Sequence, residues 1–290
     1  MDFQDLDLEM QGRYIGYYRN CRQKASDLSF VNMWSWMEVY GLQWAFDRDL
    51  VWIRQRRPVE AYWPPAGDWD RVDWEKILSA LPAGLRFIRV PEHLAMLWKN
   101  QPNSRVSLFE SREHWDYVYS VRELIELKGN RYHNKKQLLN QFLQQYDFTF
   151  EVMDDANIEE ALALQTEWCA WRDCETSDAL LEENKAIVRT LHDWNQLQGV
   201  FGAGILVDGE MVAYTVGEPL GDDTLVIHYE KACPSIVGGY QAINQLFLHH
   251  CGSRFASVNR EQDLGEEGLR KAKLSYFPSH FIKKYEVLLE

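Results

Sequence analysis

The stretch GVFGAGILVDGEMVAYTVGEPL, residues 199–220, constrains the fold of this chain more than any other segment. Two apolar runs flank Asp208–Gly209, and an Asp-Gly pair in that setting is a strong signal for a β-hairpin. Two helices are expected before it, at 157–172 and 182–194, because apolar residues recur there with helical spacing. After the hairpin we expect a strand, a helix, a strand, a helix and a final strand, at residues 224–232, 236–252, 255–259, about 265–278 and 279–289.

This order of elements resembles the layout of the acyl-CoA N-acyltransferases, the GNAT layout. In that layout a central strand leads into a helix whose exposed backbone amides hold a pyrophosphate. The corresponding place in this chain is the turn IVGGY at 236–240. Gly238 and Gly239 would let a backbone approach a ligand closely there. The usual basic residue and G-x-G/A spacing of such a turn are missing.

The first half of the chain is predicted to be mixed α/β. Alternating residues indicate a hairpin at 42–63 and strands at 85–90 and 115–121. Helices are expected at 91–100, where Pro91 opens the segment, and at 134–146. In the second of these helices Lys135 lies three and four positions before Leu138 and Leu139, so it shares their apolar face. We place a domain boundary near Asp147, which gives two domains, 1–147 and 148–290.

The charge is unevenly distributed along the chain. Residues 1–150 hold 20 Lys+Arg and 20 Asp+Glu, whereas residues 151–290 hold 11 and 24, so the net charge of −13 lies in the second half. An acidic half repels a phosphate backbone, which counts against general nucleic-acid binding. Two segments without acidic residues, Leu127–Tyr146 and Gly268–Tyr285, contain several Lys and Arg. They suit a small phosphorylated ligand.

Composition also indicates the class of protein and its compartment. Nine of the twelve tryptophans fall in the first 115 residues, and we expect them to fill a core. Five cysteines without a C-x-x-C or zinc spacing indicate reduced, mostly buried thiols and no metal site. The acidic N-terminus is unlike a secretory signal, and no apolar run approaches the roughly 20 residues of a membrane helix. A soluble, cytoplasmic protein is therefore expected.

The strand TLVIHYEKA at 224–232 contains two residues suited to acid–base chemistry. With a period of two, His228 and Glu230 face the same side, about 7 Å apart. They could form a base and its orienting partner beside an amine substrate. The alternative is the exposed polar face of an ordinary strand.

The segment VNREQDLGEEGLRKAKLSYFP at 258–278 gathers ionic and amide groups where a strand ends. Asn259 or Asp263 could cap the helix that follows, but capping does not account for Asn259, Arg260 and Glu261 together. Those three are interpreted as the wall of a site.

The helix in that segment contains one lysine on an apolar side. Lys273 lies one turn from Leu269 and one turn before Phe277, so it needs an anionic partner or a ligand. Leu264 and Leu269 are expected in the core.

Three segments together resemble one bacterial family. DYVYSVRELIELKGNRYHNKKQLLNQF, HYEKACPSIVGGYQAINQLF and VNREQDLGEEGLRKAKLSYFP are similar to signature blocks of the phosphatidylglycerol lysyltransferase C-terminal domain family, in its stand-alone branch. The resemblance covers residues 116–278. It implies an α/β (α+β) fold of two tandem GNAT-like domains, each a mixed central sheet flanked by helices, with an acyl- or aminoacyltransferase ancestry. Membrane-anchored members move lysine from aminoacyl-tRNA to a lipid head group, and this chain lacks their membrane-spanning part.

The leading prediction is therefore a transferase that moves an acyl group from acyl-CoA or aminoacyl-tRNA to an amine or hydroxyl acceptor. No tightly bound cofactor is expected. The predicted catalytic residues are Glu230, His228, Asn259 and Glu261. The residues predicted to bind the donor are Gly238, Gly239, Tyr240, Lys135, Lys136, Arg270 and Lys273.

Two alternatives stay open from the sequence. The protein could be a non-catalytic GNAT-like ligand-binding or regulatory module whose polar blocks form an internal salt-bridge network. Transfer from aminoacyl-tRNA would require a basic surface wide enough for an RNA stem, which the net charge disfavours. The sequence is compatible with either class of donor, and with a cleft within one domain or between two.

Overall fold

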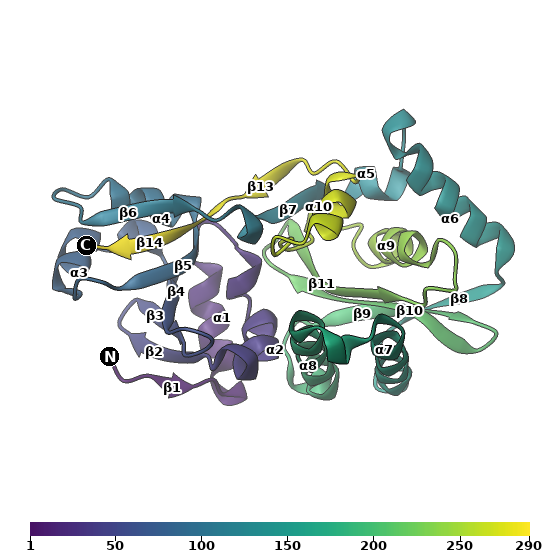
Figure 1. The fold of residues 1–290 in the computed structure, drawn as a ribbon, viewed down its shortest axis with the longest axis horizontal. Coiled ribbons are helices and arrows are strands. Elements are labelled where there is room, and N and C mark those ends of the chain that lie inside the picture. Colours follow the sequence, from purple (N-terminus) through teal and green to yellow (C-terminus); the bar gives the residue numbers. More distant parts are fainter. The chain divides into compact units, whose positions relative to one another are not determined.

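A computed structural model describes residues 1–290, which form two compact units. Each unit is built around a mixed sheet flanked by helices, and the two sheets have seven strands each (Figure 1). The predicted mixed α/β fold class is thereby confirmed. The first unit comprises Met1–Tyr117, Glu261–Lys273 and His280–Glu290, and the second comprises Val118–Arg260 and Leu274–Ser279.

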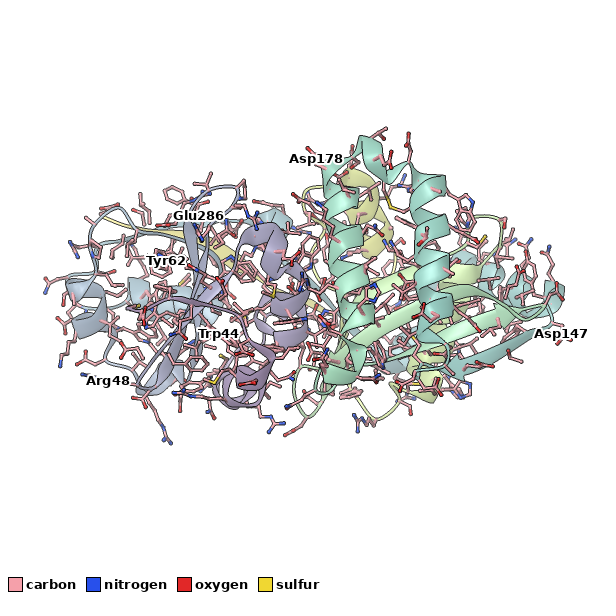
Figure 2. All side chains as sticks on the ribbon, turned by 90° about the horizontal axis from the view of Figure 1, so that it is seen from below. Trp44, Arg48, Tyr62, Asp147, Asp178 and Glu286 are labelled. Atoms are coloured by element: carbon pink, nitrogen blue, oxygen red, sulfur yellow. A yellow bond between two sulfur atoms is a disulfide. The ribbon has the colours of Figure 1, made fainter.

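The division into units differs from the boundary expected near Asp147. Asp147, labelled in Figure 2, lies inside the second unit, between α6 (His133–Gln145) and β8 (Phe148–Val152). The chain also returns to the first unit, because its last strand β14 (Lys284–Leu289) pairs with two strands of that unit. Pairing between residues so far apart in sequence leaves no mark in local composition.

The first unit contains a sheet in the order β1-β2-β3-β4-β5-β14-β6. All neighbouring pairs whose register is known are antiparallel except β4 and β5, which are parallel. The predicted hairpin is confirmed as β2 and β3. The elements are β1 (Gln4–Asp5), α1 (Gln11–Arg19), α2 (Phe30–Tyr40), β2 (Gln43–Asp47), β3 (Leu50–Gln55), β4 (Ala61–Gly67), α3 (Trp74–Ala80), β5 (Arg86–Pro91), α4 (Glu92–Lys99), β6 (Val106–Glu110), most of α10 (Glu267–Leu274), and β13 (His280–Ile282).

Aromatic residues fill the core of the first unit, as their number predicts. Seven of the nine early tryptophans are buried: Trp34, Trp44, Trp52, Trp63, Trp69, Trp74 and Trp98. Trp98 packs edge-on against Trp74 and Phe87, with ring centroids 5.3 and 4.9 Å apart. Such edge-to-face pairs add to the free energy gained by burying the rings.

Within the second unit, residues 157–259 have the element order predicted from the sequence, whereas most of the predicted helix at about 265–278 and of the predicted last strand at 279–289 belongs to the first unit. The strands of the second unit's sheet follow the order β13-β7-β12-β11-β10-β9-β8, and β9 and β10 form the hairpin around Asp208–Gly209. Helices α7 and α8 cover one face of the sheet, and α9 lies on the other (Figure 1). The further elements are most of β7 (Asp116–Ser120), α5 (Val121–Glu126), α7 (Ile158–Arg172), α8 (Asp178–His192), β9 (Phe201–Val207), β10 (Glu210–Pro219), β11 (Thr224–Ala232), α9 (Gly239–His250) and β12 (Ser257–Asn259).

The two parallel strands β11 and β12 separate soon after they begin. They pair over three residues only, from Thr224 with Ser257 to Val226 with Asn259. Strand β12 ends there, whereas β11 continues to Ala232. We call the place where the strands part, beyond Val226 and Asn259, the fork.

The cysteines differ from the prediction of free thiols. Cys169 and Cys174 form a disulfide between the last turn of α7 and the short 3-10 turn after it. Asp173, with a φ of +53°, reverses the chain between them. The other three, Cys21, Cys233 and Cys251, are free. None of the helices combines the length and the apolar character that a membrane span requires.

Candidate functional site

A carboxylate at the fork is held from two elements of the second unit. Glu230 of β11 accepts a hydrogen bond from Arg260 Nη2 at 2.8 Å and another from Asn244 Nδ2 of α9 at 2.9 Å. Arg260 follows directly after β12, so its ion pair with Glu230 joins the two arms of the fork. The side chains of Glu230 and Arg260 are 9% and 15% exposed. The pair is therefore shielded from water. The attraction between two opposite charges is stronger in such a place than in water.

Two cations of this region contact the same aromatic ring. The buried Tyr276 lies beneath Arg260, whose guanidinium carbon is 5.0 Å from the ring centroid, and Lys135 Nζ is 4.3 Å from the same centroid. Both distances are those of cation–π contacts. Burial, followed by the nearby Arg260 charge, lowers the pKa of Lys135 below its ordinary value. We call Lys135, Glu230, Asn244, Arg260 and Tyr276 the fork cluster.

The fork cluster unites residues from the three segments singled out in the sequence. Lys135 comes from the first segment, Glu230 from the second, and Arg260 and Tyr276 from the third. The prediction that Lys135 shares the buried face of its helix is confirmed, because it is half-buried while its neighbour Lys136 is exposed. Lys136 instead lines a shallow hollow of about 440 Å³ on the outer face of α6, with His133 and Asn140.

Two of the predicted catalytic residues lie within the sheet of the second unit. His228 Nε2 is 3.1 Å from Glu218 Oε1 of β10, and the two side chains are almost fully buried. The register of β10 and β11 slips by one residue at this point, so that His228 is the extra residue of a β-bulge in β11, and the alternation of faces is interrupted there. Asn259 is buried in β12, opposite Val226 and Val118.

Protein atoms fill the space beside the two glycines of the predicted phosphate-binding turn. Gly238 is the N-cap residue directly before α9 and has a φ of +80°, and a Cβ atom there would lie 2.2 Å from the carbonyl oxygen of Leu138 in α6. A Cβ atom on Gly239 would lie 3.2 Å from that of Ala232. The close backbone approach that was expected for a ligand is thus made by a helix of the protein itself.

Tyr240 belongs to a second polar group of the same unit, which sequence reasoning missed. Its hydroxyl accepts a hydrogen bond from Trp168 Nε1 at 3.0 Å, and burial raises its pKa. Lys231 Nζ lies 3.7 Å from the centroid of the Trp168 ring and donates to Glu183 Oε2 at 2.8 Å. One feature of the sequence could have indicated this group. Lys231 comes one residue after Glu230, so its side chain lies on the opposite face of the strand.

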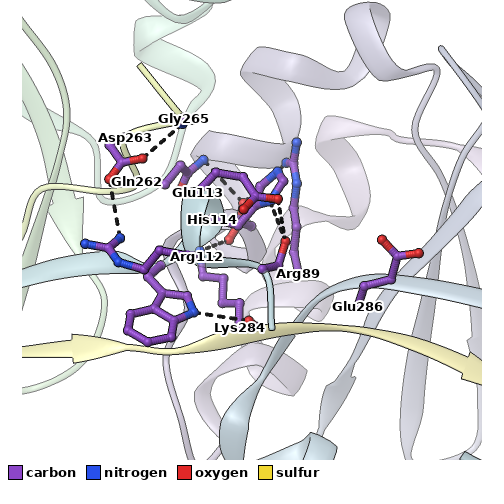
Figure 3. Close-up of polar contacts among 12 residues, drawn as sticks. Arg89, Arg112, Glu113, His114, Gln262, Asp263, Gly265, Lys284 and Glu286 are labelled. Atoms are coloured by element: carbon purple, nitrogen blue, oxygen red, sulfur yellow. Dashed lines mark hydrogen bonds and ion pairs between the residues drawn. The ribbon is translucent and has the colours of Figure 1, made fainter. Parts of the chain in front are cut away.

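The remaining predicted residues, Glu261, Arg270 and Lys273, lie in the first unit. Asp263 is fully buried and accepts from Arg270 Nε and Nη2, both at 2.8 Å, and from Tyr117 Oη at 2.5 Å (Figure 3 shows its contacts with Arg112 and Gly265). The expectation that Asp263 caps the next helix is wrong, because the carboxylate binds these side chains and the amide of Gly265, which precedes α10. Arg270 is bound through two of its nitrogens to this carboxylate.

Lys273 finds its partner in the same unit. Its ammonium group donates to the carbonyl oxygen of Gln262 and lies 5.7 Å from the Tyr117 ring centroid. The sequence predicted a carboxylate or a phosphate as the partner of this ammonium group, whereas the structure shows a backbone carbonyl as its hydrogen-bond acceptor. Leu264 and Leu269, expected in the core, are 47% and 41% exposed, because the loop and the short helix leave these side chains at the surface.

The contacts of Asp263 predict a dependence of stability on pH. Burial raises the pKa of Asp263, but hydrogen bonds from Arg270 and Tyr117 outweigh it and lower the pKa from the ordinary 3.8 to about 2. A lowered pKa stabilises the folded state above pH 4, and this contribution is lost as the pH falls from 4 to 2. We expect Asp263→Asn to remove this contribution, which is about 2 kcal/mol of the free energy of unfolding. Urea unfolding at pH 5 and at pH 2 should show the difference between wild type and variant shrinking by that amount. A constant difference would contradict the assignment.

A buried ion cluster in the first unit was not predicted. Lys284 of β14 is fully buried and donates to Asp116 Oδ1 at 2.6 Å and to Asp27. Arg89 Nη1 lies 3.3 Å from Asp27 Oδ1 (Figure 3 shows Arg89 and Lys284). Burial lowers the pKa of Lys284, but the two carboxylates outweigh it and raise the pKa. We call Asp27, Arg89, Asp116 and Lys284 the ion cluster.

Glu261 lies close to the ion cluster in the first unit. Its Oε1 accepts from Asn32 Nδ2 at 2.9 Å, and its charge acts on Arg89. Its φ of +56° is rare for a residue with a side chain and costs free energy. Burial and then the Arg89 charge lower the pKa of nearby His114 to about 4, so this imidazole is neutral at pH 7.

Comparison with known proteins places the chain in a family. The model of the family described as "Phosphatidylglycerol lysyltransferase, C-terminal" matches residues 18–288. The chain belongs to this family. The match extends the resemblance noted at 116–278 over nearly the whole chain, including the aromatic first unit.

Solved structures share the fold of this family member. A conserved protein of unknown function from Bacteroides thetaiotaomicron is 31% identical, with a TM-score of 0.91 and full coverage of both chains. L-PGS from Bacillus licheniformis is 13% identical, with a TM-score of 0.66, over 98% of this chain and 92% of the other.

A relative is also found by sequence. An uncharacterized protein of Mycoplasmoides gallisepticum is 25% identical over 176 residues, which cover 59% of this chain and 55% of that relative. The match thus spans about half the length of that relative.

Proposed function

We propose that this protein transfers an acyl or aminoacyl group from an activated donor to an amine or hydroxyl acceptor. The donor would be a coenzyme A thioester or an aminoacyl-tRNA. The observation that carries the proposal is the fork, where β11 and β12 part and the shielded ion pair of Glu230 and Arg260 links them. Membership of a family described by lysyl transfer supports the same class of reaction.

The fork cluster suits direct transfer. The acceptor nitrogen or oxygen would attack the carbonyl carbon of the donor, and the carbon–sulfur or carbon–oxygen bond to the carrier would break. The proton lost by the acceptor would pass through Glu230 to the departing thiol or ribose hydroxyl. A carboxylate has about four acceptor positions. Arg260 and Asn244 occupy two of them, so Glu230 can still accept a hydrogen bond from an acceptor group.

The cations of the fork cluster would stabilise negative charge on the reacting carbonyl oxygen and on the carrier. Fixed positive groups in a site shielded from water act more strongly than in bulk solvent. The ion pair with Glu230 and the Tyr276 ring hold Arg260 in one orientation. His228 and Asn259, buried in the sheet on either side of the fork, would support the strands rather than contact the acceptor.

Replacing Glu230 by glutamine tests this function. Gln keeps the size and the hydrogen-bonding oxygen but cannot take a proton, and we expect the transfer rate to fall about 100-fold or more. The matched control is Glu183→Gln, which also removes a carboxylate from an ion pair in the second unit, with Lys231, and should keep the rate within a few fold. Both variants are assayed at a temperature at which thermal unfolding shows them folded.

A non-catalytic ligand-binding role is the alternative, favoured by the extent to which Glu230, Arg260 and Asn244 satisfy one another. In that case neither variant alters a reaction, because none is detected with any donor. Equal rates for wild type and Glu230→Gln would remove Glu230 from the mechanism.

A further inference from the structure

We propose that Lys135 binds a phosphate group of the acyl donor. The inference rests on the proposed function and assigns one contact of the donor to one residue. Several cations of the second unit lie away from open solvent, and their partners differ.

Two of these cations have a carboxylate of their own. Lys231 is paired with Glu183, and Arg260 with Glu230, at 2.8 Å in both cases. Lys135 is half-buried, yet its contact is the ring of Tyr276, and it takes part in no ion pair. Removing an ammonium group from water is costly unless an anion compensates. A cation–π contact supplies only part of that compensation.

The charges nearby leave this part of the fork cluster positive. Lys135 and Arg260 contribute two positive charges and Glu230 one negative charge, which Arg260 already neutralises. Burial and the Arg260 charge lower the pKa of Lys135 because both disfavour its charged form, and an anion beside the ammonium group would offset that penalty. The surrounding segment, Leu127–Tyr146, contains no acidic residue. An anion is therefore the ligand that this lysine fits.

Phosphate is the anion that both classes of donor share. Coenzyme A carries a pyrophosphate and a 3′-phosphate, and the acceptor end of a tRNA carries phosphodiesters. A lysine ammonium binds phosphate as a compact point charge. The amide of Gln241, whose Nε2 lies 3.4 Å from Tyr276 Oη, offers a further donor beside the ring.

Calorimetric titration at low ionic strength tests the proposal, with coenzyme A and the trinucleotide CCA as probes. We expect wild type to bind one of the two, and Lys135→Met to bind it at least tenfold more weakly. Lys135→Arg keeps the charge and should stay within about threefold of wild type. Lys128→Met, in which an exposed lysine paired with Glu126 is lost nearby, is the matched control and should be unchanged.

The two probes distinguish the sources of phosphate. A loss confined to coenzyme A identifies a thioester donor, and a loss confined to CCA identifies an RNA donor. Unchanged affinity of Lys135→Met, or no binding of either probe to wild type, overturns the proposal. Because binding is measured without turnover, the two proposals can fail separately. If Lys135→Met loses binding but the wild-type protein transfers nothing, the role of Lys135 is supported and the transferase function is contradicted. If the Lys135→Met variant transfers the group and binds the donor as wild type does, the function is supported and the role of Lys135 is contradicted.

Discussion

Lys284→Met is expected to lower the free energy of unfolding of the first unit by about 3–5 kcal/mol. The methionine fills much of the same space but leaves Asp27 and Asp116 without their common cation. Both carboxylates are fully buried, and a buried charge without a partner is among the most destabilising changes that one substitution can make. Arg89 remains as a partner of Asp27 only, so the effect falls mainly on Asp116.

Tryptophan fluorescence during urea unfolding reports this change, because nine of the twelve tryptophans belong to the first unit. The neighbouring Lys283→Met is the matched control. That lysine is 41% exposed and lies 3.5 Å from Glu92, so its loss should cost less than about 1 kcal/mol. Adding Asp116→Asn to Lys284→Met removes the unpaired charge and should recover part of the stability. A Lys284→Met protein within 1 kcal/mol of wild type would contradict the claim that Lys284 stabilises the first unit by compensating the charges of Asp27 and Asp116.

Gly238→Ala is the second change with a large expected effect, about 3 kcal/mol or more for the second unit. An alanine at a φ of +80° is strained, and its Cβ atom would lie 2.2 Å from the carbonyl oxygen of Leu138. Helices α6 and α9 would have to move apart. Hydrogen exchange of amides in α9 measures the loss without interference from the first unit.

Gly221→Ala is the matched control for that experiment, since a Cβ atom there meets nothing within 4 Å. Its stability should stay within about 0.5 kcal/mol of wild type. If Gly238→Ala were equally stable, the glycine would not be needed for helix packing, and the interpretation that it makes room for a ligand would regain support.

Local signals in the sequence predict much of the second unit. The Asp208–Gly209 hairpin, the helices around it and the inward face of Lys135 depend on residues close together in the chain. Glu230, within a predicted strand, and Arg260, directly after another, also stand out from the sequence. Their ion pair is a consequence of parallel strands that part after three residues, which no local pattern specifies.

The first unit was less predictable because its polar contacts join distant segments. Asp27 and Lys284 are 257 positions apart, and Asp263 and Tyr117 are 146 apart. Asp263 has the sequence context of a helix cap, and only the tertiary structure brings Arg270 and Tyr117 to it. The Cys169–Cys174 disulfide was missed for a different reason: a five-residue spacing matches no familiar motif, and the turn at Asp173 that closes it is not visible in composition.

The most direct test of the proposed transfer follows a labelled acyl group. Wild-type protein is incubated with acetyl-CoA or lysyl-tRNA, each labelled in the acyl group, and with a mixture of primary amines, amino acids, polyols and phosphatidylglycerol vesicles. Mass spectrometry then identifies any acceptor that has gained the label. We expect the label to leave one of the two donors and to appear on an amine or hydroxyl compound, in amounts that exceed the protein present. If both donors keep their label, or lose it only to water at the uncatalysed rate, the transferase assignment is contradicted.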